Sequence, residues 1–168
     1  GILSDTLVLR SATTTDADRE IAEYLASITD LEIDELGRDI MGAASQAARR
    51  PADEVIRLDL KEYDASGLRF SVSQVEVSDN AEIMERRQEI LAELASLRAE
   101  KGYYLAALMA TDVTELTSIL LIDADKDFLS LVSYPKDAEG VYVLKDILSR
   151  KKQLMPAIFE LVEKAQEG

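Results

Sequence analysis

The feature that most constrains the fold is an almost unbroken apolar run from Tyr103 to Ala110. A strand with one solvated face alternates apolar and polar residues, whereas a strand covered on both faces is apolar throughout. The run is too short for a membrane span, which needs about 18 apolar residues. A second run covers Thr117–Ile122. The two runs predict strands of a sheet that is covered on both faces.

Helical patterns precede and separate these strands. Thr15 is a predicted N-cap, and Ile21, Leu25 and Ile28 then recur at helical spacing, so this helix is expected to bury one face. Pro51 ends the next helix, and Gly102 is the predicted C-cap of the longest one. The predicted helices are 15–28, 33–49, 81–101, 125–132 and 154–162.

Further strands are predicted at 58–64, 68–77 and 141–144. In the first of them, alternation places Leu58 and Leu60 on one face and Lys61 on the other. Strands alternate with helices after residue 58, and 168 residues is the usual length of one domain. We therefore predict an α/β fold in which a mixed β-sheet of about five strands packs with helices in a single domain.

The composition excludes several kinds of chemistry. The chain has no His and no Cys, which removes imidazole acid–base catalysis, the usual nucleophile–His pairs, disulfides and thiolate metal sites. A formal net charge of −14 opposes binding to nucleic acid or to an anionic membrane surface. With no signal peptide or membrane span in view, we expect a soluble, cytoplasmic protein.

Three consecutive cations stand out in this acidic chain, at Arg150, Lys151 and Lys152 within the segment Ser149–Gln153. They precede the final predicted helix, where cations have the wrong sign for the helix dipole and an anion is favoured. One interpretation is a solvated basic turn, since charge runs usually lie on the surface. The other is a grip for phosphate or carboxylate. Thr111 and Asp112, at a predicted strand end, similarly indicate either a ligand position or a capped turn.

Five segments taken together resemble one family. They are Ile2–Leu7 with Arg10, Ser11 and Thr13–Thr15 after it, Asp59–Tyr63, Ser73–Val75, Leu108–Asp112, and Ser149–Gln153. In this order the chain is similar to the C-terminal part, the DHH-associated type-2 domain, of family II manganese-dependent inorganic pyrophosphatases of the DHH phosphoesterase superfamily. Ala12 departs from the proline expected in the family's inter-domain linker.

The resemblance implies roles for individual residues. Asp5 matches a metal ligand contributed at the end of the family's N-terminal domain. Lys61, Arg150 and Lys151 match residues that bind pyrophosphate in the cleft between the two domains, whereas Lys152 is assigned no contact. Residues 1–15 are then the end of the N-terminal catalytic domain plus the linker, and residues 16–168 are the substrate-gripping domain.

The resemblance also implies partners that lie outside this chain. The intact enzyme would hold Mn²⁺, with Mg²⁺ possible on the substrate, in an N-terminal DHH domain, and it would form a homodimer. This chain alone could be a monomer, and no nucleic acid or membrane partner is expected. Because the chain lacks the family's Asp-His-His motif, we expect it to bind no metal tightly and not to hydrolyse pyrophosphate by itself.

Two alternatives remain open from the sequence. The parent could be an exopolyphosphatase or another DHH phosphoesterase, or the chain could be a non-catalytic anion-binding or interaction domain. The relative position of Lys61 and Arg150 separates the grip from the solvated turn. Side chains that meet on one open face would favour the grip, and side chains on opposite faces would exclude it.

Overall fold

The apolar run lies in the middle strand of a mixed sheet. A computed structural model describes residues 1–6, 8, 9, 14–29 and 31–167, and in these residues five strands pair in the order β1-β2-β3-β4-β5. Only β2 and β3 pair in parallel, and the other neighbours are antiparallel. The predicted α/β fold with a mixed sheet is confirmed.

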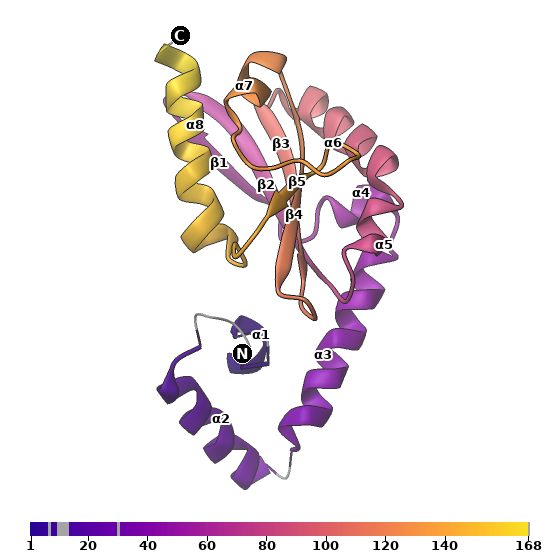
Figure 1. Cartoon of the computed structure of the whole chain (residues 1–168), viewed down its shortest axis with the longest axis vertical. Helices are drawn as coiled ribbons and strands as arrows, with labels where there is room; N and C mark the ends of the chain where they lie inside the picture. The colour runs from indigo at the N-terminus through magenta and orange to yellow at the C-terminus, as the bar shows by residue number, and fades with distance from the viewer. Residues whose placement is uncertain (7, 10–13, 30, 168) are drawn as a thin grey trace.

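The elements alternate as the sequence patterns predict from β1 onward (Figure 1). In chain order they are α1 (Ile2–Asp5), α2 (Asp16–Thr29), α3 (Ile33–Ala48), α4 (Ala52–Val55), β1 (Lys61–Ala65), β2 (Leu68–Val77), α5 (Ala81–Met84), α6 (Arg87–Lys101), β3 (Leu105–Asp112), β4 (Thr117–Ala124), α7 (Lys126–Leu131), β5 (Tyr142–Leu144), the π-helix η1 (Arg150–Leu154) and α8 (Met155–Glu167).

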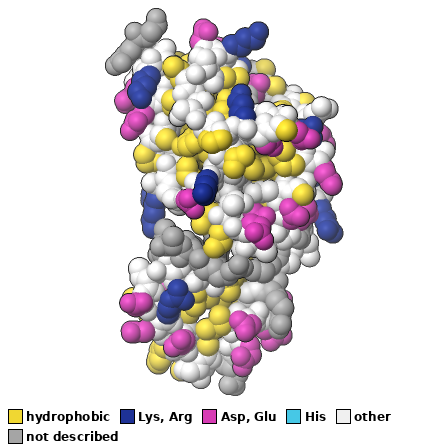
Figure 2. Space-filling model, viewed as in Figure 1, with side chains coloured by type: hydrophobic (Ala, Val, Ile, Leu, Met, Phe, Trp, Pro, Cys, Tyr) yellow, Lys and Arg dark blue, Asp and Glu magenta, His cyan; other side chains and the backbone are white. Residues whose placement is uncertain are grey.

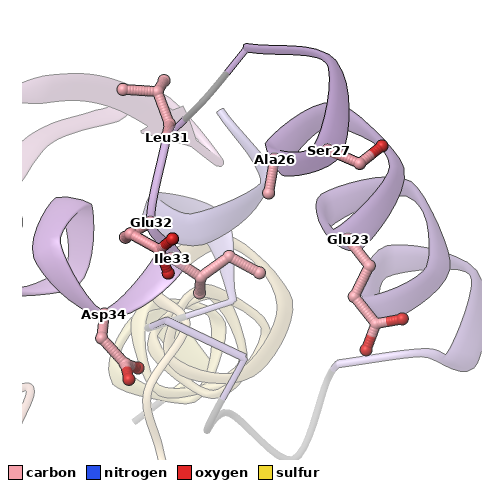
Figure 3. Close-up of a pocket in the computed structure, with 7 residues that line it drawn as sticks. All are labelled: Glu23, Ala26, Ser27, Leu31, Glu32, Ile33 and Asp34. Atoms are coloured by element: carbon pink, nitrogen blue, oxygen red, sulfur yellow. The ribbon is translucent and has the colours of Figure 1, made fainter.

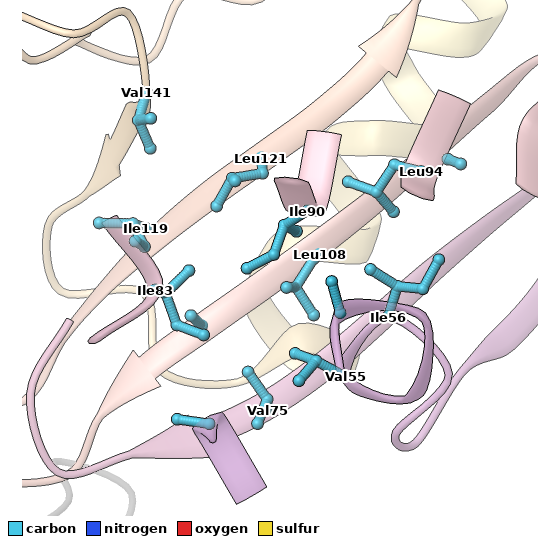
Figure 4. Close-up of a cluster of buried hydrophobic side chains, with 14 of the residues drawn as sticks. Val55, Ile56, Val75, Ile83, Ile90, Leu94, Leu108, Ile119, Leu121 and Val141 are labelled. Carbon is cyan, nitrogen blue, oxygen red and sulfur yellow. The ribbon is translucent and has the colours of Figure 1, made fainter. Parts of the chain in front are cut away.

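Helices cover both faces of the sheet, and this explains why β3 is apolar from Leu105 to Ala110. On one face, Leu108 packs with side chains of α4, α5 and α6, such as Val55, Ile83 and Leu94 (Figure 4). On the other face, its neighbour Met109 packs in a cluster with α7 and α8. All eight residues of β3 are buried. Within the described residues, no helix is long and apolar enough to cross a membrane.

The predicted helix 81–101 is wrong in one respect, because it is interrupted between Met84 and Arg87. Arg86 leaves the helical backbone, with φ −105° and ψ 10°. Its guanidinium donates hydrogen bonds to the carbonyls of Ala48 and Arg50, both at 2.8 Å. These carbonyls lie at and just beyond the end of α3, so the interruption allows Arg86 to cap that helix end.

The predicted strand 58–64 is also partly wrong, because pairing with β2 begins only at Lys61. Leu58 and Asp59 lie in a turn, and Asp59 has a left-handed backbone with φ +41°. Leu58 and Leu60 are partly buried against the cluster that includes Leu108. Their alternation therefore arises from packing at a turn and not from a pleated strand.

The N-terminal helices extend beyond one end of the sheet (Figure 1). Thr15 caps α2 as predicted, because its hydroxyl accepts from the Asp18 N–H at 3.2 Å and its N–H donates to the Asp18 carboxylate at 2.8 Å. The expectation that α2 buries an apolar face is wrong. Its large apolar side chains are exposed in this chain, with Ala22 as its buried residue.

Candidate functional site

Lys61 is the first residue of β1, directly after the turn that contains Asp59. Its side chain is exposed, and its Nζ lies 3.6 Å from Oδ1 of Asp59. Asp59 lies at the end of that turn and has a left-handed backbone, with φ +41°.

Arg150 reaches the same turn from the opposite end of the chain. It begins η1, and its side chain is only 8% exposed. Nη2 donates to Oδ2 of Asp59 at 2.9 Å, while Nη1 donates to the backbone carbonyl of Asp59 and to that of Val72 at 3.1 Å. Nε is buried and has no hydrogen-bond partner among the described residues. Arg150 therefore braces three segments, namely the turn before β1, strand β2 and η1.

Lys61 and Arg150 thus converge on one carboxylate. Lys61 approaches Oδ1 of Asp59 and Arg150 approaches Oδ2. The Asp59 side chain is 54% exposed, so the meeting point is open to solvent. This is the arrangement that favours an anion grip over a plain basic turn, because two cations are held around a position that an oxyanion already occupies.

The rest of the Ser149–Gln153 segment shapes η1. The Ser149 hydroxyl accepts from the Lys152 N–H at 3.2 Å. Oε1 of Gln153 accepts hydrogen bonds from the Leu148 and Ser149 N–H groups, both at 3.0 Å. Its Nε2 donates to the Asp146 carbonyl at 2.7 Å. Ser149 and Gln153 are therefore structural residues that fix the turn into η1.

Lys151 and Lys152 point outward from this framework. Both are exposed, and neither forms an ion pair with a described residue within 4.0 Å. The positive charge of Lys152 contributes to lowering the pKa of Asp18, after the hydrogen bonds from Thr15, which are the main cause. The start of α2 consequently lies within electrostatic reach of η1.

Thr111 and Asp112 fit the capped-turn interpretation. Asp112 accepts the N–H groups of Thr114 and Glu115 at 2.8 and 2.7 Å, and the Asn80 N–H at 3.3 Å. The Thr111 hydroxyl bonds to that of Ser118 at 3.0 Å. Both side chains are buried and their hydrogen bonds close the β3–β4 turn, so the structure does not bring them into the Lys61–Arg150 site.

A second polar pair lies beside Lys61. Tyr103 donates a hydrogen bond to the carboxylate of Glu62, which also pairs with Arg69 at 3.2 Å. Burial, followed by the bond to Glu62, raises the pKa of Tyr103 to about 12. The bond from Tyr103, supported by Arg69, lowers the pKa of Glu62. The pair links β1 to the segment that enters β3.

The Tyr103–Glu62 pair predicts a pH effect at the alkaline end. The folded chain holds the Tyr103 proton more tightly than the unfolded chain, whose tyrosine pKa is about 10. Its contribution to stability is complete below pH 10 and is lost as the pH rises toward 12. Glu62→Gln should move the Tyr103 titration to lower pH. The absorbance of the Tyr103 phenolate is the difference between a chain and its Tyr103→Phe counterpart, and it is followed against pH with and without Glu62→Gln. A Tyr103 titration that Glu62→Gln leaves unchanged would contradict the assignment.

Asp5 was predicted as a metal ligand, but its side chain lies outside the part of the chain that the structure describes. Its backbone belongs to α1. No group of three or more acidic side chains within metal-binding reach is found among the described residues, and the sequence supplies no His or Cys. The described side chains therefore do not provide the ligand set that Mn²⁺ requires.

A pocket of about 550 Å³ lies elsewhere, between the end of α2 and the start of α3 (Figure 3). Its lining includes Glu23, Glu32 and Asp34, so its charge is unsuited to an anion. On the face shown in Figure 2, Lys and Arg side chains are scattered singly among Asp and Glu. The described residues on this face therefore form no broad basic patch.

Comparison with known proteins assigns the chain to a family. Residues 38–161 match the DHHA2 domain. The chain belongs to the DHHA2 domain family. This DHHA2 chain is 32% identical over 168 residues to a manganese-dependent inorganic pyrophosphatase of Methanocaldococcus jannaschii, covering 99% of this chain and 53% of that protein. It is 33% identical over 161 residues to a "probable manganese-dependent inorganic pyrophosphatase" of Streptococcus equi, covering 95% of this chain and 52% of that protein.

A solved structure agrees with the sequence comparison. The fold matches a crystal structure described as a family II inorganic pyrophosphatase of Methanococcus jannaschii with a TM-score of 0.82 and 32% identity, covering 99% of this chain and 53% of that one. The resemblance drawn from the sequence motifs is confirmed. The DHHA2 chain spans about half the length of these pyrophosphatase relatives.

Sequence reasoning missed Asp59 as a member of the site. Its placement two residues before Lys61 was visible, and alternation put the two side chains on one face. The contact with Arg150 could not be read from the sequence because the two residues are 91 positions apart.

Proposed function

We propose that this DHHA2 domain is the substrate-binding part of a manganese-dependent inorganic pyrophosphatase, which hydrolyses diphosphate to two phosphates. The proposal assigns Lys61, Arg150 and Lys151 to binding the phosphate groups. The observation that carries it is the convergence of Lys61 and Arg150 on one solvent-accessible carboxylate. The names of the relatives support pyrophosphate as the ligand.

The three cations would contribute in different ways. Lys61 and Lys151 are exposed and can present their ammonium groups directly to phosphate oxygens. Arg150 is buried and fixed by two backbone carbonyls, so it supplies a preorganised positive charge. Cations held in advance around the position of a phosphate stabilise the charge on the transferring and leaving groups without reorganising.

We further propose that residues 1–15 join this domain to a preceding catalytic domain and that residues 16–168 form the substrate-gripping domain. In this proposal Asp5 and the Mn²⁺ ions belong to the catalytic side of the inter-domain cleft, because the described residues of this chain lack a metal-binding cluster. The chain by itself would then bind pyrophosphate but not hydrolyse it.

Titration of this chain with pyrophosphate, followed by amide NMR, tests the proposal. We expect saturable shifts at Lys61, Arg150 and Lys151, with inorganic phosphate and sulfate weaker. Lys61→Ala and Lys151→Ala should each weaken binding about 10-fold or more, because each removes a charge-assisted contact.

Lys126→Ala is the matched control. Lys126 is an exposed lysine in α7, at the other end of the sheet from η1 (Figure 1), so its loss changes the net charge equally without touching the site. Equal weakening by all three variants would mean that only the overall charge matters, and the proposed grip would be rejected.

A further inference from the structure

The carboxylate of Asp59 lies between the cationic groups of Lys61 and Arg150. Oδ2 accepts from Arg150 at 2.9 Å and Oδ1 lies 3.6 Å from Nζ of Lys61. A carboxylate and a phosphate offer the same kind of oxygen acceptors to a guanidinium and an ammonium group. Asp59 therefore satisfies these cations in the way that a bound phosphate would.

Arg150 does not depend on this carboxylate for its position. Nη1 is held by the carbonyls of Asp59 and Val72, and the side chain is 8% exposed among the surrounding segments. If the carboxylate turned away, the guanidinium would remain in place with a donor on Nη2 released. The buried Nε, which has no partner among the described residues, adds to the positive potential that is left uncompensated.

The Asp59 side chain, by contrast, is free to turn. Its carboxylate is half-exposed, so water can solvate it when it leaves Arg150, and Arg150 keeps its hydrogen bonds to the carbonyls of Asp59 and Val72. Its backbone is fixed independently by the bond between its own carbonyl and Arg150. The carboxylate can leave the cations without any movement of the turn.

We propose that Asp59 determines the affinity of the proposed phosphate site, by acting as an internal competitor whose carboxylate is displaced when phosphate binds. This inference rests on the proposed function of Lys61 and Arg150. An anion with several charges replaces the single charge of Asp59 on both cations, while the displaced carboxylate turns into solvent and repels the ligand from there.

The variant Asp59→Asn tests this with little disturbance of the fold. Asn tolerates the left-handed backbone at φ +41°, and its side-chain oxygen can still accept from Arg150. Removing one negative charge a few ångströms from a multiply charged ligand should tighten pyrophosphate binding by about 3- to 10-fold in a partly solvated site. Isothermal titration calorimetry of this chain with pyrophosphate measures the change.

Asp53→Asn is the matched control, since Asp53 is an exposed acidic residue of α4 and its loss changes the net charge by the same amount. Tighter binding by Asp59→Asn but not by Asp53→Asn supports the inference. Weaker or unchanged binding by a folded Asp59→Asn chain, with the parent binding normally, overturns the inference and leaves the proposed function standing. Binding by neither the parent nor Asp59→Asn overturns both.

Discussion

Replacing Arg150 with methionine should lower the free energy of unfolding by about 2–4 kcal/mol. Methionine fills part of the volume but donates no hydrogen bond. It leaves the buried carbonyl of Val72 and the carbonyl of Asp59 without their guanidinium partner. The lost ion pair with Asp59 adds little, because that carboxylate is half-exposed and screened by solvent. The unsatisfied carbonyls therefore account for most of the effect.

Chemical denaturation of this chain checks the Arg150 prediction. Lys151→Met is the matched control, since it removes the adjacent cation from an exposed position and should change stability by less than about 0.5 kcal/mol. An Arg150→Met chain as stable as Lys151→Met would show that Arg150 is not a brace. The pyrophosphate titrations therefore use Lys61 and Lys151 variants, because an Arg150 variant confounds folding with binding.

Phe70→Ala should have a still larger effect, about 3–5 kcal/mol. Phe70 in β2 is fully buried and forms one corner of an aromatic cluster with Tyr63 of β1 and Phe159 of α8. The ring centroids lie 5.5–5.8 Å apart, a separation at which aromatic pairs attract one another. Truncation leaves a cavity between the sheet and α8, where neighbouring side chains can collapse only partly.

Thermal unfolding of Phe70→Ala beside Tyr24→Ala gives the comparison. Tyr24 of α2 is also a large aromatic residue but is 63% exposed, so its truncation should cost less than about 0.5 kcal/mol. Equal losses in the two variants would contradict the core assignment. This aromatic cluster also supports the proposed phosphate site. Phe159 anchors α8 to the strands, and α8 directly follows η1, which begins with Arg150.

The order and type of most elements could be predicted because their signals are local. The apolar run of β3 and Gly102 at the end of α6 each follow from neighbours in the sequence, and the structure confirms them. Two of the errors in element boundaries coincide with long-range contacts. Arg86 interrupts a helix to reach α3, and Asp59 leaves the extended conformation to meet Arg150. In both cases an arginine contact between distant segments overrides the local pattern.

The site could be predicted only in part, for the same reason. The motif Ser149–Gln153 and Lys61 were visible as residues that could bind an anion, but nothing in the sequence indicated that Arg150 would be buried. The exposed apolar face of α2 likewise could not be read from its helical spacing, because spacing shows that a helix has an apolar stripe and not what covers it.

The strand order has a consequence for Lys61 itself. In the described sheet β1 has only β2 as a neighbour, so one side of its backbone is an unpaired edge. An unpaired edge can recruit a strand of another molecule, and charged side chains along it discourage such aggregation. Lys61, Glu62 and Asp64 place one positive and two negative charges on this edge strand. The lysine proposed to hold pyrophosphate is therefore also part of what keeps the sheet from extending into a neighbouring chain.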